Sequence, residues 1–252
     1  MKIDLRFRSP NYSIRKFPIQ FIILHYTAIE FTAAINKLCH LESNVSAHYV
    51  IRADGEIFML VEDQHIAWHA GASYWKNFYR LNEHSIGIEL DNLSYTPYPI
   101  AQTQSCVNLC NHLVKLHNIP RFNILGHSDI APDRKSDPGP FFDWSYLATH
   151  NLGLWHGLSE ANDDYNIMYQ FGDRSSNIYK LQQKLQILGY KIESTGIFDS
   201  QTNYVVRAFQ THFYPQLITK FGKELYHDDH HLYPWDSVSN GLLHHLLATL
   251  DV

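Results

Sequence analysis

The sequence predicts an α/β fold, with a mixed central sheet flanked by helices, followed by a small three-helix C-terminal domain. Two observations lead to this prediction. Over the first 150 residues, short apolar runs typical of buried strands alternate with segments whose apolar residues recur at helical spacing. After residue 173 come three amphipathic helical segments, and roughly 80 residues can support a small core of their own. We therefore expect a first domain at 1–158, a linker at 159–173 and a C-terminal domain at 174–252.

The first strand is predicted at Phe21-Ile-Ile-Leu-His25, a short apolar run that ends on a polar residue. Thr27 and Glu30 then have the spacing of a capping box. Residues 31–38 follow, with apolar side chains at helical spacing. The chain is therefore expected to leave the strand through a capped turn and enter a helix.

The next elements are predicted to be strands. Ala47–Ile51 and Glu56–Val61 flank Asp54-Gly55, which is a good hairpin turn signal. Residues 62–84, rich in His, Trp and Tyr, are expected to form an exposed loop that crosses the sheet. In Ser85–Asp91 apolar and polar residues alternate, so the carboxylates of this strand should lie on the face opposite the apolar one.

A long helix at 103–118, a strand at Phe122–Gly126 and a short helix at 143–150 complete the predicted first domain. The long helix carries Cys106 and Cys110 one turn apart, near enough for a bridge. Buried free thiols are the favoured prediction. None of the 3 cysteines has the paired spacing of a structural zinc site.

The C-terminal segments carry their own start and stop signals. Gly189 is expected to end the first helix, Asp199 to cap the second, and Ser239 to begin the third. Two histidine pairs, His230-His231 and His244-His245, raise the possibility of a metal site. Adjacent residues on a helix do not face one another, so both pairs are predicted to be ordinary surface or core residues.

Composition narrows the classes of function. The net charge of −5 and the pI near 6.4 argue against a surface for nucleic acid or anionic lipid. No apolar run approaches the length of a membrane span. Residues 1–20 mix basic residues with prolines and lack the apolar core of a signal peptide. The sequence therefore leaves open a cytoplasmic protein or one whose targeting segment was removed.

One loop and one strand end suggest a metal site. His127 and Asp137 lie ten residues apart around Pro132, so they belong to an irregular loop that can aim both side chains at one point. His25 is the natural third ligand, because it and His127 both follow predicted strands, and ligands gather at the carboxyl ends of strands in open α/β sheets. Two imidazoles, one carboxylate and an open position make up a catalytic zinc site.

The surrounding motifs resemble the zinc-dependent N-acetylmuramoyl-L-alanine amidases, a superfamily that includes phage lysozyme-type amidases and peptidoglycan recognition proteins. The resemblance runs over nearly the whole chain and is greatest to the AmiD type, whose members carry a second, C-terminal domain. The motifs that carry it are His25-Tyr-Thr-Ala, Ser46-Ala-His-Tyr49, Ala67-Trp-His-Ala-Gly71, Asn82-Glu-His-Ser-Ile-Gly-Ile-Glu89 and His127-Ser-Asp-Ile-Ala-Pro-Asp-Arg-Lys-Ser-Asp-Pro-Gly-Pro140.

This resemblance implies roles for individual residues. His25, His127 and Asp137 would bind Zn²⁺, and Glu89 and Lys135 would carry the chemistry. Glu89 would act as the general base and acid, and Lys135 would face the oxyanion of the tetrahedral intermediate. The alternatives are a solvated strand carboxylate for Glu89 and a plain loop charge for Lys135.

The resemblance also suggests residues that contact the substrate. Arg80 stands where related amidases bind the terminal carboxylate of the diaminopimelate stem, and Arg134 is a second candidate for peptide carboxylates. Tyr49, Trp68 and His69 are expected to wall the cleft, with a core aromatic as the alternative for Trp68. His48, on the same motif as Tyr49, is expected to support a ligand or to be structural.

The C-terminal part is similar to the three-helix peptidoglycan-binding domain, although Pro215–Trp235 departs from the compact spacing usual there. The alternative is a helical appendage that only packs on the first domain. The segments that carry the similarity are Leu181-Gln-Gln-Lys-Leu-Gln-Ile-Leu-Gly-Tyr190, Gly196-Ile-Phe-Asp199 and Ala208-Phe-Gln-Thr-His-Phe213.

The expected activity is therefore hydrolysis of the amide between N-acetylmuramic acid and L-alanine in peptidoglycan and muropeptides. The expected location is the cell envelope or periplasm, with the cytoplasm as the alternative, and the expected oligomeric state is a monomer. The rival function is a receptor that binds muropeptides without cutting them. Hydrolysis is favoured, because noncatalytic members of the superfamily typically lose a zinc ligand and all three are present here.

Overall fold

The computed structural model describes residues 1–158, 165–220 and 232–250. The chain forms two compact units. The first unit comprises residues 1–73, 79–127 and 137–154, and the second comprises 74–78, 128–136 and 155–252. The short segments 74–78 and 128–136 thus belong to the same unit as the C-terminal helices.

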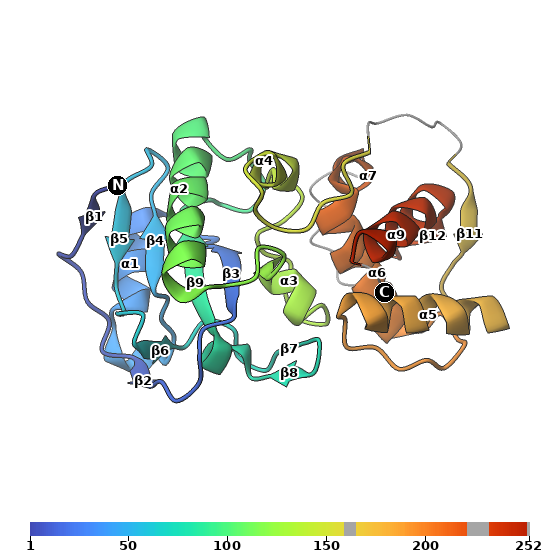
Figure 1. Cartoon of the computed structure of the whole chain (residues 1–252), viewed down its shortest axis with the longest axis horizontal. Coiled ribbons are helices and arrows are strands. Elements are labelled where there is room, and N and C mark those ends of the chain that lie inside the picture. Colours follow the sequence, from blue (N-terminus) through green and yellow to red (C-terminus); the bar gives the residue numbers. More distant parts are fainter. Residues whose placement is uncertain (159–164, 221–231, 251–252) are drawn as a thin grey trace. The chain divides into compact units, whose positions relative to one another are not determined.

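The first unit is built on a six-stranded sheet of order β1-β5-β4-β9-β3-β10 (Figure 1). The hairpin pair β4 and β5 is antiparallel, while the other neighbours are parallel, so the predicted mixed sheet is confirmed. The strands are β1 (Ile3–Asp4), β3 (Phe21–Tyr26), β4 (Tyr49–Ile51), β5 (Ile57–Met59), β9 (Ser85–Leu90) and β10 (Ile124–Gly126).

Helices cover this sheet, with α2 drawn in front of the strands and α1 behind them (Figure 1). Helix α1 (Phe31–Leu38) buries Ile35 and Leu38 in a cluster with Val50 of β4 and Phe58 of β5. Helix α2 (Ile100–His117) packs on β4, where the buried Gln102 side chain donates a 2.8 Å hydrogen bond to the Ile51 carbonyl. A shorter helix, α4 (Trp144–Thr149), follows the last strand.

The predicted capping box before α1 is wrong. The helix begins at Phe31, so Glu30 is itself the N-cap, and its side chain makes no capping hydrogen bond. The Thr27 hydroxyl instead donates to the Ile29 carbonyl at 2.8 Å. The spacing was right for a box, but the helix starts three residues too late for Thr27 to cap it.

Residues 62–84 are not the exposed loop that was expected. They contain β6 (His65–Ala67), which pairs antiparallel with β2 (Tyr12–Ile14), and the 3₁₀ helix η2 (Leu81–His84). The side chains of Ala67, Ala70 and Leu81 are fully buried. Pairing with β2 satisfies backbone groups of residues 65–67, so this part of the segment can be buried. Two further short strands lie here, β7 (Tyr74–Trp75) and β8 (Phe78–Tyr79).

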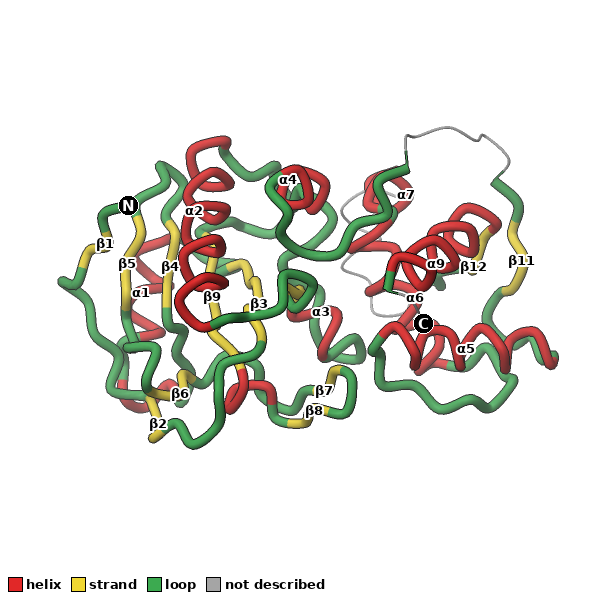
Figure 2. Tube along the Cα trace, viewed as in Figure 1, coloured by secondary structure: helices red, strands yellow, loops and turns green. Residues whose placement is uncertain are grey.

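The second unit contains the three predicted C-terminal helices, α5 (Ser176–Leu188), α6 (Ser200–Phe213) and α9 (Ser237–Thr249) (Figure 2). It also holds α7 (Pro215–Lys220) and the strand pair β11 (Ile167–Tyr169) and β12 (Trp235–Asp236). A single helical turn, α3 (His127–Ile130), starts at the last residue of a first-unit segment.

The ends of these helices follow the sequence signals closely. The Asp199 side chain accepts from the Thr202 N–H as the N-cap of α6, and Gly189 ends α5 with a φ of 144°, both as predicted. The third helix begins at Ser237, because Asp236 caps it, and the predicted start at Ser239 is two residues late. His244 and His245 are exposed, as expected, whereas the His230-His231 pair lies outside the described residues.

Two smaller expectations can also be checked. Cys106 and Cys110 are buried free thiols with their sulfur atoms 4.0 Å apart, and Cys39 is a half-buried free thiol. Within the described ranges of the chain, no helix combines the length and the apolar character that crossing a membrane requires.

Candidate active site

The sheet register brings three predicted residues to neighbouring strand ends. Strands β3 and β9 run parallel with His25 opposite Glu89, so the two side chains lie on the same face. On the other side of β3, Gly126 of β10 pairs with Leu24. His127 follows directly, level with His25. The carboxyl ends of three adjacent parallel strands thus carry an imidazole, an imidazole and a carboxylate.

Asp137 completes a convergent cluster. Its Oδ2 lies 2.8 Å from His25 Nδ1 and 3.1 Å from His127 Nδ1, and the two nitrogens are 3.0 Å apart. All three residues are buried. For ligand bonds of about 2.0–2.2 Å, a tetrahedral metal centre needs ligand atoms roughly 3.3 Å apart. The three atoms therefore fit one face of such a centre after an outward shift of a few tenths of an ångström.

The charge state of Asp137 suits a ligand. Burial by itself would raise the pKa of its carboxyl group, but the neighbouring His127 and His25 outweigh that effect and hold the pKa well below its usual range. The side chain is therefore an ionised carboxylate, which can only accept hydrogen bonds or donate electron pairs to a cation.

The outer nitrogen of His127 is held by the backbone. Its Nε2 lies 3.2 Å from the Ala70 carbonyl oxygen, which can only accept, so the proton sits on Nε2 and the Nδ1 lone pair stays available. The Asn82 side chain fixes this stretch, because its Oδ1 accepts from the N–H groups of His69 and Ala70 at 3.0 and 2.6 Å. Asn82 belongs to one of the recognised motifs, but nothing in the sequence around it predicted this role.

The outer nitrogen of His25 begins a chain of hydrogen bonds. His25 Nε2 donates to His69 Nδ1 at 3.0 Å, and His69 Nε2 donates to the Ser85 hydroxyl at 3.2 Å. The Ser85 hydroxyl in turn donates a hydrogen bond to the Leu81 carbonyl at 2.6 Å. Burial holds the pKa of His69 well below its usual value, so this ring is neutral and can accept at one nitrogen. With its proton on Nε2, His25 turns the Nδ1 lone pair toward Asp137.

A glycine makes room for that histidine. A Cβ at Gly87 would lie 2.4 Å from Cγ of the His69 ring, far inside contact distance. His69 was predicted to be a cleft wall, and the structure places it under β9 against a proposed ligand. The Gly87-Ile-Glu89 motif therefore carries a packing requirement as well as a carboxylate.

The two residues predicted to carry chemistry lie on different elements. Glu89 is half-buried on β9. Lys135 is half-buried and Arg134 is exposed in segment 128–136, where both backbone N–H groups donate to the Ala131 carbonyl. Their chemical roles stay predictions.

Arg80 and Trp68 line the same cavity of the first unit, with a volume of about 810 Å³. Arg80 is exposed, adopts a left-handed backbone conformation with φ of 56°, and pairs with Glu83. The Trp68 indole N–H donates to the Ser13 hydroxyl at 3.0 Å. A carboxylate entering this cavity would find a guanidinium on a flexible stem and an aromatic wall.

The structure does not bring Tyr49 to this cluster. Tyr49 pairs with Ile88 in the register of β4 and β9, so its side chain lies on the sheet face opposite Glu89. It is buried, and its hydroxyl donates to Asp63 at 2.7 Å. His48, one residue earlier, is fully buried, and its Nδ1 accepts from the Gly87 N–H at 3.0 Å.

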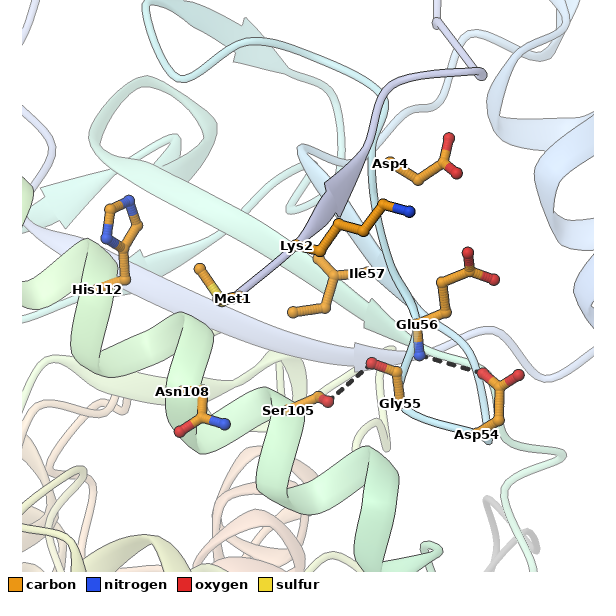
Figure 3. A pocket seen from close by; sticks show the side chains of 10 residues that line it. All are labelled: Met1, Lys2, Asp4, Asp54, Gly55, Glu56, Ile57, Ser105, Asn108 and His112. Carbon is orange, nitrogen blue, oxygen red and sulfur yellow. Dashed lines mark hydrogen bonds between the residues drawn. The ribbon is translucent and has the colours of Figure 1, made fainter.

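A second hollow of the first unit, about 730 Å³, lies beside β1, the β4–β5 turn and α2 (Figure 3). None of the predicted site residues lines it. Its lining residues are Met1, Lys2, Asp4, Asp54, Gly55, Glu56, Ile57, Ser105, Asn108 and His112.

Comparison with known proteins gives two family matches along the chain. Residues 15–140 match the family described as N-acetylmuramoyl-L-alanine amidase, and residues 174–217 match a peptidoglycan-binding domain family. The N-acetylmuramoyl-L-alanine amidase AmiD of Escherichia coli K12 is 34% identical over 218 residues, which are 79% of this chain and 76% of that protein. The 1,6-anhydro-N-acetylmuramyl-L-alanine amidase AmpD of Enterobacter cloacae is 46% identical over 109 residues, 43% of this chain and 57% of that protein.

Two solved structures resemble this chain over almost its full length. E. coli AmiD in complex with anhydro-N-acetylmuramic acid-L-Ala-D-γ-Glu-L-Lys has a TM-score of 0.72 and 27% identity, covering 97% of this chain and 93% of that one. AmpDh3 of Pseudomonas aeruginosa with an anhydromuramic pentapeptide has a TM-score of 0.70 and 28% identity, covering 92% of both chains. From its family match, its relatives and its fold, the chain belongs to the N-acetylmuramoyl-L-alanine amidase family.

Proposed function

We propose that this chain hydrolyses the amide between N-acetylmuramic acid and L-alanine with a zinc ion held by His25, His127 and Asp137. The convergence of two Nδ1 atoms and one carboxylate oxygen within 2.8–3.1 Å of one another carries the proposal. Nitrogen and oxygen ligands in this number suit zinc and leave a position for water. When bound, zinc would lower the pKa of a water molecule and polarise the scissile carbonyl.

Glu89 is the proposed proton carrier. It lies opposite His25 in the sheet register, on the same face. There it would take the proton of the attacking water and return it to the leaving amine of L-alanine. A single carboxylate can perform both transfers, because the group it protonates leaves from the carbon that the water attacked.

Lys135 is the proposed oxyanion partner. Its sequence position, two residues before Asp137, and the resemblance of this motif to the family support the assignment. An ammonium group aimed at the developing oxyanion stabilises the tetrahedral intermediate more than the planar amide, which lowers the barrier.

The proposed substrates are muropeptides and the cell-wall polymer, and the proposed location is the cell envelope. The relatives solved with anhydromuramyl peptides support this substrate class. Arg80, exposed at the rim of the cavity that Trp68 also lines, is the proposed contact for a stem-peptide carboxylate.

The test is digestion of purified sacculi and of an anhydromuramoyl tripeptide, followed by identification of the products. We expect free peptide with an N-terminal L-alanine, loss of activity on chelation and recovery with Zn²⁺. A protein that binds the tripeptide but releases no peptide in the presence of Zn²⁺ would instead be a receptor, and the proposed hydrolysis would be wrong.

The second unit is proposed to hold the enzyme on the insoluble polymer, as the family match of residues 174–217 suggests. A tethered second site raises the effective concentration of the first. Full-length Glu89→Gln protein should therefore sediment with sacculi, and a chain that ends near residue 158 should do so poorly. Melting curves must accompany this comparison, because segments 74–78 and 128–136 belong to the unit that the truncation removes. Equal sedimentation of the two folded proteins would contradict anchoring.

A further inference from the structure

The segment 128–136 joins two proposed metal ligands but does not belong to their unit. It starts directly after His127, ends directly before Asp137 and carries Lys135. In the structure it is part of the second unit, together with α5 and α6. The contacts inside that unit therefore determine the conformation of the chain between the ligands.

A buried carboxylate anchors the segment. Asp129 is 1% exposed and receives one donor at each oxygen: the Tyr190 hydroxyl at 2.9 Å from Oδ1, and His212 Nδ1 at 2.8 Å from Oδ2. Tyr190 and His212 are equally buried. Because a carboxylate only accepts, both partners must donate, and the two bonds fix the direction of the side chain.

A second contact holds the middle of the segment. Arg207 of α6 is 5% exposed, and its Nη2 donates to the Pro132 carbonyl at 2.9 Å. Taking a guanidinium out of water is costly unless its donors find acceptors. The hydrogen bond from the buried Arg207 of α6 to the Pro132 carbonyl therefore indicates that α6 helps to determine the conformation of this loop.

Tyr190 is itself held in place from the other side. Its ring meets the Trp75 indole edge-on, with 4.9 Å between centroids. Gly189, which ends α5, allows this approach, because a Cβ there would lie 2.4 Å from Trp75 Cε2. The Lys76 N–H also donates to the Gly189 carbonyl at 3.1 Å. The tyrosine hydroxyl is therefore aimed at Asp129 by rigid neighbours.

We propose that Tyr190, His212 and Arg207 are positioning residues for the amidase reaction. They hold segment 128–136 in one conformation and so restrict the backbone that carries Lys135. This inference rests on the proposed function, because Lys135 matters only if it meets the developing oxyanion. It gives the C-terminal helices a task in catalysis beside polymer binding.

The mechanism is entropic. A free loop of this length samples many backbone conformations, and an ammonium group that is misplaced for part of the time contributes less to the transition state. Each buried hydrogen bond to the loop removes alternatives before the substrate arrives. The two ligand histidines are placed by strands β3 and β10 and by their contacts with His69 and Ala70, so loosening the segment should affect turnover more than metal binding.

The test uses full-length Tyr190→Phe and Arg207→Met with a matched control, Thr202→Val. The control also removes one hydroxyl from a buried site of the second unit, where Thr202 bonds Gln182 and Asp199 and does not contact the segment. The measurements are amide hydrogen exchange of residues 128–136 without substrate, bound zinc, and kcat and KM on an anhydromuramoyl tripeptide.

Tyr190→Phe should raise exchange in segment 128–136 and lower kcat by roughly 5- to 10-fold, which is the size of the net contribution of one ordinary hydrogen bond. KM and zinc content should not change. Arg207→Met should act in the same direction. Thr202→Val should lower the melting temperature without either effect.

Exchange and kcat of Tyr190→Phe that match the control would overturn the proposal, and so would loss of zinc in Tyr190→Phe. Because exchange is measured without substrate, the positioning can fail while the amidase activity stands. An inactive wild-type protein would contradict the proposed function. The hydrogen-exchange result would still show whether Tyr190 and Arg207 hold segment 128–136.

Discussion

The protein contains two buried clusters of imidazole and carboxylate that are built differently, although His127 of one and Asp129 of the other are only two residues apart. In one, His25, His127 and Asp137 turn three electron-pair donors toward a common point at 2.8–3.1 Å. In the other, Asp129 receives a separate proton donor at each oxygen, from Tyr190 and His212. The first cluster turns electron-pair donors inward, which suits a cation, while in the second the carboxylate oxygens already accept from proton donors.

The difference shows how a metal site can be told from a structural one. Both clusters use a buried aspartate and histidine, and Asp129 follows His127 by only two residues. What separates them is where the outer imidazole nitrogens find acceptors. Ala70 and His69 hold the protons of the ligand histidines on Nε2, which points both Nδ1 lone pairs inward. In His212 the Nδ1 proton points at the carboxylate.

The largest difference between the clusters is expected when the aspartate of each is replaced by asparagine. Asp137→Asn should lose stoichiometric zinc and with it nearly all hydrolysis, because a neutral amide is a poor ligand. Asp129→Asn should keep one zinc per chain and lose about 2 kcal/mol of unfolding free energy, typical of a weakened buried hydrogen bond to a charged group. Metal analysis and denaturant melts measure both. If Asp129→Asn released zinc as readily, the distinction between the clusters would be wrong.

Glu89→Gln should separate chemistry from metal binding at the first cluster. The variant should hold zinc and lose kcat by roughly 10²- to 10⁴-fold, since an amide cannot carry the proton. Lys135→Met should lose on the order of 10²-fold for lack of oxyanion stabilisation. Steady-state kinetics with metal analysis tests this. A change confined to KM would make either residue a substrate contact.

Gly87→Ala should weaken the metal site without touching a ligand. The new methyl group would collide with His69, which orients His25. Loss of such outer support typically costs 10- to 100-fold in metal affinity, measurable by competition with a chromophoric chelator. Gly241→Ala is the control, because a Cβ there meets nothing within 4 Å. Unchanged affinity in Gly87→Ala would show that His69 does not support the ligand.

Arg80→Ala should affect only substrates that carry the stem carboxylate. We expect kcat/KM on a muramoyl tripeptide to fall roughly 10-fold, consistent with one charge-assisted contact at an exposed site. Cleavage of muramoyl-L-alanine should be unchanged. Equal losses on the two substrates would point to a structural role for Arg80.

The smallest effect concerns acid stability. Burial, with help from Arg15, lowers the pKa of His48 from 6.5 to about 3. Below pH 6.5 His48 is protonated in the unfolded chain but stays neutral in the folded chain. The free energy of unfolding therefore decreases as the pH falls from 6.5 toward 3. Between pH 7 and 5 the loss is about 2 kcal/mol.

His48→Gln should flatten that part of the stability profile, measured by urea unfolding at several pH values. His112→Gln is the control, because His112 is exposed. An unchanged slope in His48→Gln would mean that His48 does not resist protonation.

Local signals in the sequence predicted much of this architecture. The buried run Phe21-Ile-Ile-Leu-His25, the Asp199 cap and the Gly189 stop depend on residues close in sequence, and the structure confirms each element. The family membership was likewise predicted from ordered motifs and is confirmed. His25, His127 and Asp137 could be predicted together as metal ligands, because strand ends and an irregular loop can be recognised from the sequence alone.

Only the tertiary structure decided what neighbours across the sheet and between distant segments do. Side chains alternate with a period of two, so register alone placed Tyr49 on the face away from Glu89. His69 took its position under β9 because Gly87 lies opposite it, a match that no local pattern contains. Segment 128–136 joined the second unit through Asp129 and Pro132, whose partners lie more than 60 residues away. Local propensity determined the elements, whereas contacts between residues far apart in sequence determined which side chains meet.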